Sequence, residues 1–447
     1  MLVSTALVLL MTPGLALFYG GMVRSKSVLN MMMMSLSAMG LVGILWALYG
    51  YSMAFGNDVG GGLLGNPFEA FGLSGLFVGT YTGDEVSYPM SGTIPALLFV
   101  GFQATFAIIT VALISGAVAD RMRFGPWLLF AGLWATVVYF PVAHWVFAFD
   151  NDDAGVVGGW IANDIAAIDF AGGTAVHINA GVAALALALV LGKRRGWPRE
   201  PMRPHNLTLV MLGAGLLWFG WFGFNAGSAL GANGTAAFAL VNTIVATCAA
   251  MLAWLLVERA RDGKPTSLGA ASGIVAGLVA ITPACSSVSP LGGIAIGAVA
   301  GVLCALAVGL KYRFGYDDSL DVVGVHLVGG LVGTVLIGLL ADPGSPAGVA
   351  GTFYGGGVDQ LWRQVVGALA VLLYSGVVSA VLALIVKATI GLRVSEEAEA
   401  TGIDETEHAE TGYDFSSLRG GGGLGTSRPP SVTAASAPVP ATAGKES

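Results

Sequence analysis

The chain has 447 residues, of which 55% are hydrophobic and only 11% are charged. Soluble domains carry about 25% charged residues, so this composition excludes a globular enzyme held by a single anchor and indicates a polytopic membrane protein. The formal net charge of −7 says little about partners, because much of it comes from the acidic C-terminal tail.

Apolar runs set the predicted helices. A transmembrane helix needs about 20 apolar residues, and counting such runs predicts eleven spans, of which the eighth is short. The runs cover residues 2–22, 29–54, 93–118, 125–149, 168–192, 206–229, 235–257, 268–284, 290–310, 321–341 and 364–391. The first positive charges, Arg24 and Lys26, follow the first run. A signal peptide has the reverse order, so we expect the first run to be a transmembrane helix.

Basic residues fix the predicted orientation, because they gather in alternate connections. These connections hold Arg24 and Lys26, Arg121 and Arg123, Lys193 to Arg203, Arg259 to Lys264, Lys311 and Arg313, and Lys387 and Arg393. The connections between them contain only Arg363. The positive-inside rule therefore places the N-terminus outside and the C-terminus inside, which requires an odd number of spans.

The expected fold is an all-α, multi-pass plasma-membrane protein. Its first ten spans are predicted to form an inverted repeat of five plus five helices, with the eleventh helix added. We predict a transmembrane domain over residues 1–391 and a polar, acidic cytoplasmic tail over 392–415. Residues 416–447 are rich in Gly, Ser, Pro and Ala and are predicted to be disordered.

Two histidines lie inside apolar runs, where ionisable groups usually have a function. Asp169 and His177 lie in the fifth span, about 12 Å apart on one helix, and Asp321 and His326 form a second such pair in the tenth. We expect the two imidazoles to meet in the bundle and line a pore. They could pass a small polar molecule, relay a proton, or bind a metal, although no third metal ligand has useful spacing.

The carboxylates allow two interpretations. Asp169 could stabilise an incoming cation or cap the fifth helix by accepting backbone N–H groups. Asp317, Asp318 and Asp321 precede the tenth span in the same way.

Aromatic residues accompany these spans. Phe102 and Phe106 share a helix face, as do Trp221 and Phe224, with Ser228 one turn further on. Aromatic faces attract a desolvating cation by about 0.5–2 kcal/mol each, whereas core packing or an interfacial belt is the alternative. A hydroxyl beside rings suits a small cation that needs one directed acceptor.

Several segments together resemble the ammonium transporter family (Amt/Mep/Rh), and its bacterial Amt branch in particular. They are DFAGGTAVHINAG followed by LGKRR, FQATFAIITVALISGAVADRMRF, WFGFNAGSAL, AGLVAITPAC, DDSLDVVGVHLVGG and GIDETEHAETGYDF. The resemblance covers residues 1 to about 415. It implies eleven spans with the N-terminus outside, and a homotrimer with one pore in each subunit.

The resemblance also implies roles for residues at matching positions. The pore histidines match His177 and His326, with Thr282 as a further pore residue. The gate matches Phe106 and Phe224. The positions of the family's cation-recruitment site match Ser228, Phe106, Trp221, Phe147 and Asp169.

One position departs from the family. Many relatives have a tryptophan where this chain has Phe147, and Phe binds a cation more weakly than Trp. Trp145 or Trp160 could take its place.

In the tail, Gly402, Asp404, His408 and Tyr413 resemble the cytoplasmic segment through which relatives couple their subunits. The resemblance also implies that a P-II-type signalling protein could block this transporter.

The expected function is therefore transport of ammonium or ammonia, with recruitment and deprotonation of the cation at an extracellular vestibule. The alternative is an ammonium sensor that signals through its cytoplasmic tail. A membrane enzyme is not expected, because no loop contains a nucleophile–base or ligand set. No cofactor, metal or nucleic acid is expected; the expected partners are ammonium, lipid, two further subunits and a P-II-type protein.

Overall fold

The computed structural model describes residues 1–82, 85–152, 155–200 and 202–413. The predicted disordered extension, 416–447, lies outside the described residues, as do the last two residues of the predicted tail. Residues Met1–Gly412 form one compact unit, and this unit is predominantly helical, as the sequence predicts.

Ten helical stretches of the described chain are long and apolar enough to cross a membrane, and the shorter α10 lies among them. The protein is thus a multi-pass membrane protein, whereas the count of eleven spans and their orientation remain predictions. The longer α-helices are α1 (Leu2–Met22), α2 (Val28–Leu45), α4 (Ala96–Ile114), α5 (Phe124–Trp134), α7 (Asn179–Leu191), α8 (Leu207–Gly227), α9 (Gly234–Asp262), α10 (Ser267–Ile281), α11 (Pro290–Ala307), α13 (Val328–Leu340) and α14 (Asp359–Thr389).

Short elements complete the bundle. The short α-helices are α3 (Tyr51–Phe55), α6 (Phe140–Phe147), α12 (Leu310–Phe314), α15 (Glu396–Thr401) and α16 (Ile403–His408). The 3₁₀ segments are η2 (Phe71–Leu73), η3 (Ser115–Val118) and η9 (Thr352–Tyr354), and the π-helical segments are η1 (Trp46–Gly50), η4 (Ala135–Tyr139), η6 (Ile161–Ile165), η7 (Gly173–Ile178) and η8 (Val323–Leu327). β1 (Thr80–Thr82) pairs antiparallel with β2 (Glu85–Ser87), and β3 (Met90–Ser91) with β4 (Ile94–Pro95).

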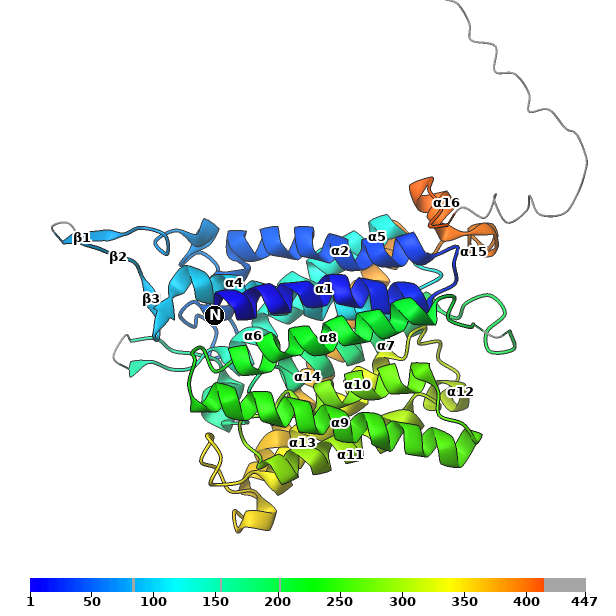
Figure 1. The fold of residues 1–447 in the computed structure, drawn as a ribbon. Coiled ribbons are helices and arrows are strands. Elements are labelled where there is room, and N and C mark those ends of the chain that lie inside the picture. The colour runs from blue at the N-terminus through cyan, green and yellow to red at the C-terminus, as the bar shows by residue number, and fades with distance from the viewer. Residues whose placement is uncertain (83–84, 153–154, 201, 414–447) are drawn as a thin grey trace, which may run out of the picture. The chain divides into compact units, whose positions relative to one another are not determined.

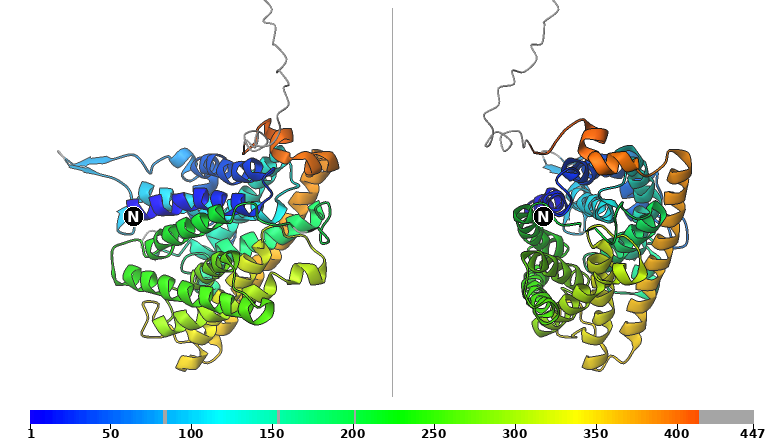
Figure 2. Two further views of the ribbon diagram at one scale, coloured as in Figure 1. Left: turned by 45° about the vertical axis from the view of Figure 1, so that its right-hand side comes forward. Right: turned by 90° about the vertical axis from the view of Figure 1, so that its right-hand side faces the viewer.

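The long helices run side by side in one bundle (Figure 1). α1 packs along α8, α9 contacts α10 and α11, and α14 packs against α7 along one side of the bundle (Figure 2). The N-terminus and the β1–β2 hairpin lie at one end, and α15 and α16 lie at the other (Figure 1).

Polar residues begin several of these helices. The side chains of Asn206, Asn233, Thr266 and Ser289 each accept a hydrogen bond from the backbone N–H three residues on, at the starts of α8, α9, α10 and α11. Such caps satisfy N–H groups that have no partner within the helix. The helix starts are therefore encoded locally.

Glycine allows α9 and α11 to approach closely. A Cβ atom at Gly297 would overlap the carbonyl oxygen of Ala246, and one at Gly301 would overlap that of Ala250. Lipid provides no hydrophobic drive between helices, so close van der Waals packing of this kind holds them together.

The two spans that carry the predicted pore histidines both begin with a π-helical segment. η7 leads into α7, and η8 leads into α13. π-Turns are rare and occur frequently at functional sites, which directs attention to this part of the bundle.

Candidate functional site

His177 of η7 and His326 of η8 face each other inside the bundle. Their ring centroids are 5.4 Å apart, and the two Nδ1 atoms are 3.4 Å apart. Both side chains are buried. Because a hydrogen bond needs one donor and one acceptor, the two facing nitrogens share a single proton.

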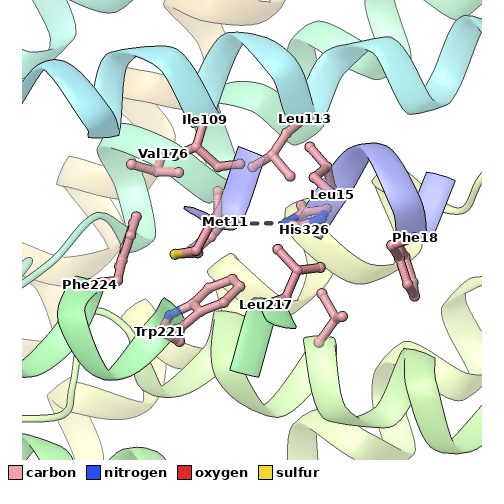
Figure 3. Close-up of a pocket in the computed structure, with 12 residues that line it drawn as sticks. Met11, Leu15, Phe18, Ile109, Leu113, Val176, Leu217, Trp221, Phe224 and His326 are labelled. Atoms are coloured by element: carbon pink, nitrogen blue, oxygen red, sulfur yellow. Dashed lines mark hydrogen bonds between the residues drawn. The ribbon is translucent and has the colours of Figure 1, made fainter. Parts of the chain in front are cut away.

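A narrow, mostly apolar cavity surrounds this pair (Figure 3). Its lining side chains come from α1, α4, α8, α10, η7 and η8: Met11, Leu15, Phe18, Ile109, Leu113, Val176, His177, Leu217, Trp221, Phe224, Val275 and His326. The free volume is about 10 Å³, roughly the space that one water molecule needs. The cavity therefore admits a small molecule only in single file.

The other polar groups around this cavity are already paired. The indole Nε1 of Trp221 donates to Oγ1 of Thr282 (2.8 Å), and that hydroxyl donates to the Leu278 carbonyl (2.7 Å). Nε2 of His177 is buried and has no hydrogen-bond partner within the described residues. The imidazoles are thus the groups left to interact with a molecule in the cavity.

Two stacked phenylalanines separate this inner cavity from a wider outer one. The rings of Phe106 on α4 and Phe224 on α8 have centroids 4.1 Å apart and are inclined by 22°. Phe224 lines the inner cavity and Phe106 the outer. The two predicted gate residues thus stack on each other, one lining each cavity.

The outer cavity has a volume of about 290 Å³. Its walls include Phe147, Ser228 and Phe106, three of the predicted recruitment residues. The Ser228 hydroxyl donates its hydrogen to the Phe224 carbonyl (2.8 Å). Its oxygen lone pairs consequently remain free to accept a hydrogen bond from a bound cation.

The other predicted recruitment residues lie elsewhere. Trp221 lines the inner cavity, below the phenylalanine stack. Asp169 does not line the outer cavity; it borders a separate cavity beside Ser286 and Thr235. The structure therefore brings together Ser228, Phe106 and Phe147 but not all five.

Asp169 caps the segment that carries His177. One carboxylate oxygen accepts the N–H groups of Gly172 (2.8 Å) and Gly173 (2.6 Å). The other accepts the N–H groups of Thr174 and Ala175 as well as the Thr174 hydroxyl. All the described hydrogen-bonding capacity of this carboxylate is thus directed at the start of η7.

Asp321 does not play the matching role in the tenth span, contrary to the pairing expected from the sequence. It forms an ion pair with Lys311 (Nζ to Oδ1, 2.6 Å), whereas Asp318 accepts the backbone N–H of Val323 (2.8 Å) at the start of η8. Asp318 lies eight residues before His326, as Asp169 does before His177. With Asp318 in place of Asp321, the acid-to-histidine spacing is the same in the fifth and the tenth span.

A third cavity continues from His326 toward the end of the bundle that carries α15 and α16. It is lined by Phe18, Tyr19, Met22, Ser272, Val275, Leu320, Asp321, Val325 and His326. Because His326 borders both this cavity and the inner one, these two cavities are neighbours on either side of its ring.

Buried ion pairs surround that end of the path. Arg194 bridges Asp120 (3.3 Å) and Asp317 (2.8 Å). Burial alone would raise the pKa of Asp317, but hydrogen bonds and positive charge from Arg194 and Arg121 outweigh burial and hold the pKa below its usual value. This network joins connections that lie far apart in the sequence.

Comparison with known proteins gives the family. The family model described as "Ammonium Transporter Family" matches residues 1–413. The chain belongs to the ammonium transporter family. The ammonium transporter of Mycobacterium tuberculosis (strain ATCC 25618 / H37Rv) is 70% identical over 433 residues, which cover 94% of this chain and 90% of that relative. The ammonium transporter of Aquifex aeolicus (strain VF5) is 52% identical over 420 residues, covering 93% of this chain and 92% of the relative.

Solved structures of this ammonium transporter family share the fold. The crystal structure of Saccharomyces cerevisiae Mep2 matches with a TM-score of 0.78 and 35% identity, covering 88% of this chain and 86% of that one. A structure described as "Sensor Amt Protein" matches with a TM-score of 0.81 and 27% identity, covering 91% of this chain and 96% of that one.

Two further polar residues, not predicted from the sequence, lie near the outer cavity. Gln103 lines the cavity directly, and His144 is buried behind its wall. Each is a polar residue in a predicted apolar span, and a polar residue in such a span indicates a functional role.

Proposed function

We propose that this ammonium transporter recruits the ammonium cation in the outer cavity, deprotonates it at the phenylalanine stack, and passes the neutral molecule along His177 and His326. Ser228 accepts a hydrogen bond from the cation, and the rings of Phe106 and Phe147 contribute cation–π attraction. The proton follows separately or remains outside.

The distribution of hydrogen-bond acceptors carries this proposal. The Ser228 oxygen has free lone pairs in the outer cavity, whereas polar groups of Trp221 and Thr282 beside the inner cavity already have partners. A bare cation in an apolar interior costs several kcal/mol even after relaxation. Deprotonation removes this cost for ammonium, while potassium has no proton to release.

The test is transport by purified protein in liposomes, comparing ammonium with potassium gradients. Wild-type protein is expected to take up ammonium and to give no potassium current. His177→Ala is expected to lose potassium exclusion, because the ring no longer fills and selects within the cavity. The matched control is His205→Ala, since His205 contacts the Val23 carbonyl away from the cavities (2.8 Å). Unchanged selectivity in His177→Ala would refute the proposed route.

We also propose a homotrimer with one pore in each subunit, and binding of a P-II-type protein at the cytoplasmic face. The tail supports this as an ordered surface: Asp404 accepts the N–H groups of Leu29 (3.0 Å) and Asn30 (2.8 Å) at the start of α2. Native mass spectrometry of the purified protein, with and without a P-II-type protein, tests both points.

The alternative proposal is an ammonium sensor, and the similarity to the structure described as "Sensor Amt Protein" is the observation that favours it. The liposome assay separates the two functions. Substantial ammonium flux supports transport, whereas ammonium binding without flux supports sensing.

A further inference from the structure

His144 lies near the C-terminal end of α6, behind the wall of the outer cavity, and its side chain is completely buried. Nδ1 is 3.1 Å from the carbonyl oxygen of Ala54, and Nε2 is 3.3 Å from Oδ1 of Asp58. Both neighbours can only accept a hydrogen bond. Nδ1 can therefore donate to the Ala54 carbonyl, whereas Nε2 is buried beside Asp58 and has no hydrogen-bond partner within the described residues.

Asp58 is held as a carboxylate by its own turn. Its carboxylate accepts the backbone N–H groups of Gly60 (3.0 Å) and Leu64 (3.3 Å). Although burial works in the opposite direction, backbone N–H groups of this glycine-rich turn hold the pKa of Asp58 below its usual value. The turn thus folds around the charged form of Asp58.

The same turn is bonded to the segment that follows α6. The N–H of Asp58 donates to the Val157 carbonyl (3.0 Å), and the N–H of Val157 donates to the side chain of Asn57 (2.8 Å). The indole of Trp145 donates to the Leu63 carbonyl (2.8 Å). Residues 54–65, 144–152 and 155–160 are therefore joined into one frame, with the His144–Asp58 pair at its centre.

This frame carries part of the outer cavity. Phe147, Ala148, Phe149 and Val156 all line that cavity and all belong to the second segment of the frame. Phe147 follows His144 by less than one helical turn. A shift in the frame would move the aromatic wall against which the cation is proposed to rest.

We propose that His144 and Asp58 are positioning residues for ammonium recruitment: their contact fixes the aromatic wall of the outer cavity and thereby sets the apparent affinity for the cation. This inference rests on the proposed function of the outer cavity. Neither residue lines the cavity itself, so each acts through Phe147 and its neighbours.

The test compares Asp58→Asn, His144→Gln and the double variant in the liposome uptake assay, with rates normalised to the amount of folded protein. Each single variant is expected to raise KM for ammonium by about three- to tenfold, the range of one cation–aromatic contact, while the maximal rate stays within about twofold. The double variant is expected to match the single variants, because all three remove the same interaction.

Asp164→Asn is the matched control. Asp164 is exposed in the same connection but lies after the frame, so the variant removes one negative charge from the same side without changing the frame. An equal rise in KM in this control would replace positioning by a general surface-charge effect and overturn the proposal.

Trp145→Phe is a milder variant that tests the same frame if Asp58→Asn and His144→Gln do not fold. It removes the bond to the Leu63 carbonyl and part of the ring that packs against Trp160 and Tyr374, and it is expected to raise KM by about twofold. Unchanged KM in the variants that fold overturns the proposal while leaving the proposed function intact. Absence of ammonium transport by the wild-type protein would instead refute the proposed function.

Discussion

Replacing Asp169 by asparagine tests whether this acid acts as a helix cap. In the structure one carboxylate oxygen accepts two N–H groups, from Gly172 and Gly173, and the other accepts donors from Thr174 and Ala175. An asparagine side chain keeps one oxygen, whereas its amide nitrogen cannot accept. At least two donors at the start of η7 therefore lose their acceptor.

The size of the effect follows from these bonds. A hydrogen bond to a charged group contributes about 1.5–3 kcal/mol, so the loss of two corresponds to roughly 3–6 kcal/mol of stability at the segment that holds His177. This is a large share of the stability of a typical protein. We expect Asp169→Asn to lower the unfolding temperature. We also expect it to lower the maximal rate of ammonium uptake by about tenfold or more.

Thermal unfolding of the purified protein and uptake into liposomes measure the two effects. Asp164→Asn is the matched control, because Asp164 is exposed and lies five residues earlier. If Asp169 acted mainly by attracting the cation, the variant would raise KM and leave the unfolding temperature unchanged. An Asp169→Asn protein with wild-type unfolding temperature and maximal rate would refute the capping argument.

Three further predictions concern the gate, the helix packing and the ion pairs. Phe224→Ala removes one ring of the stack whose centroids are 4.1 Å apart. We expect liposomes that contain this variant to leak water and potassium in flux measurements, and the absence of leakage would contradict this. Gly297→Ala places a Cβ against the Ala246 carbonyl. Overpacking of this kind costs about 1–3 kcal/mol of stability, so we expect a lower unfolding temperature. The pKa of Asp317 beside Arg194 is lower in the folded protein than the value of about 4 expected in the unfolded chain. Stability should therefore fall as the pH drops below about 4. Unfolding measured from pH 6 to pH 3 should show a smaller loss of stability in Asp317→Asn.

The sequence contains enough information to predict the membrane-spanning helices and the two histidines. Apolar length identifies the spans, and an imidazole in an apolar run is conspicuous. The sequence did not reveal which acid caps the tenth span, because Asp317, Asp318 and Asp321 lie close together. Asp321 has φ of 63°, so the chain reverses there and sends this carboxylate to Lys311 instead.

Contacts between distant segments were also beyond prediction. Arg194 meets Asp120 and Asp317 only once three connections converge at one end of the bundle. The His144–Asp58 pair likewise joins a helix to a loop more than 80 residues earlier in the chain. Local periodicity predicts that such groups lie at helix ends, but it holds no information about which of them pair.

On the proposed function, selectivity follows from where acceptors are present. Outside the stack, the Ser228 oxygen and the aromatic wall replace part of the cation's hydration. Inside it, the Trp221 indole donates to Thr282, whose hydroxyl donates to the Leu278 carbonyl, and the two imidazoles share a proton between facing nitrogens. A neutral molecule that can both donate and accept fits such a row, whereas a cation finds no charge to balance its own. The stack then separates two environments, and only a species that can lose its charge is stable in both.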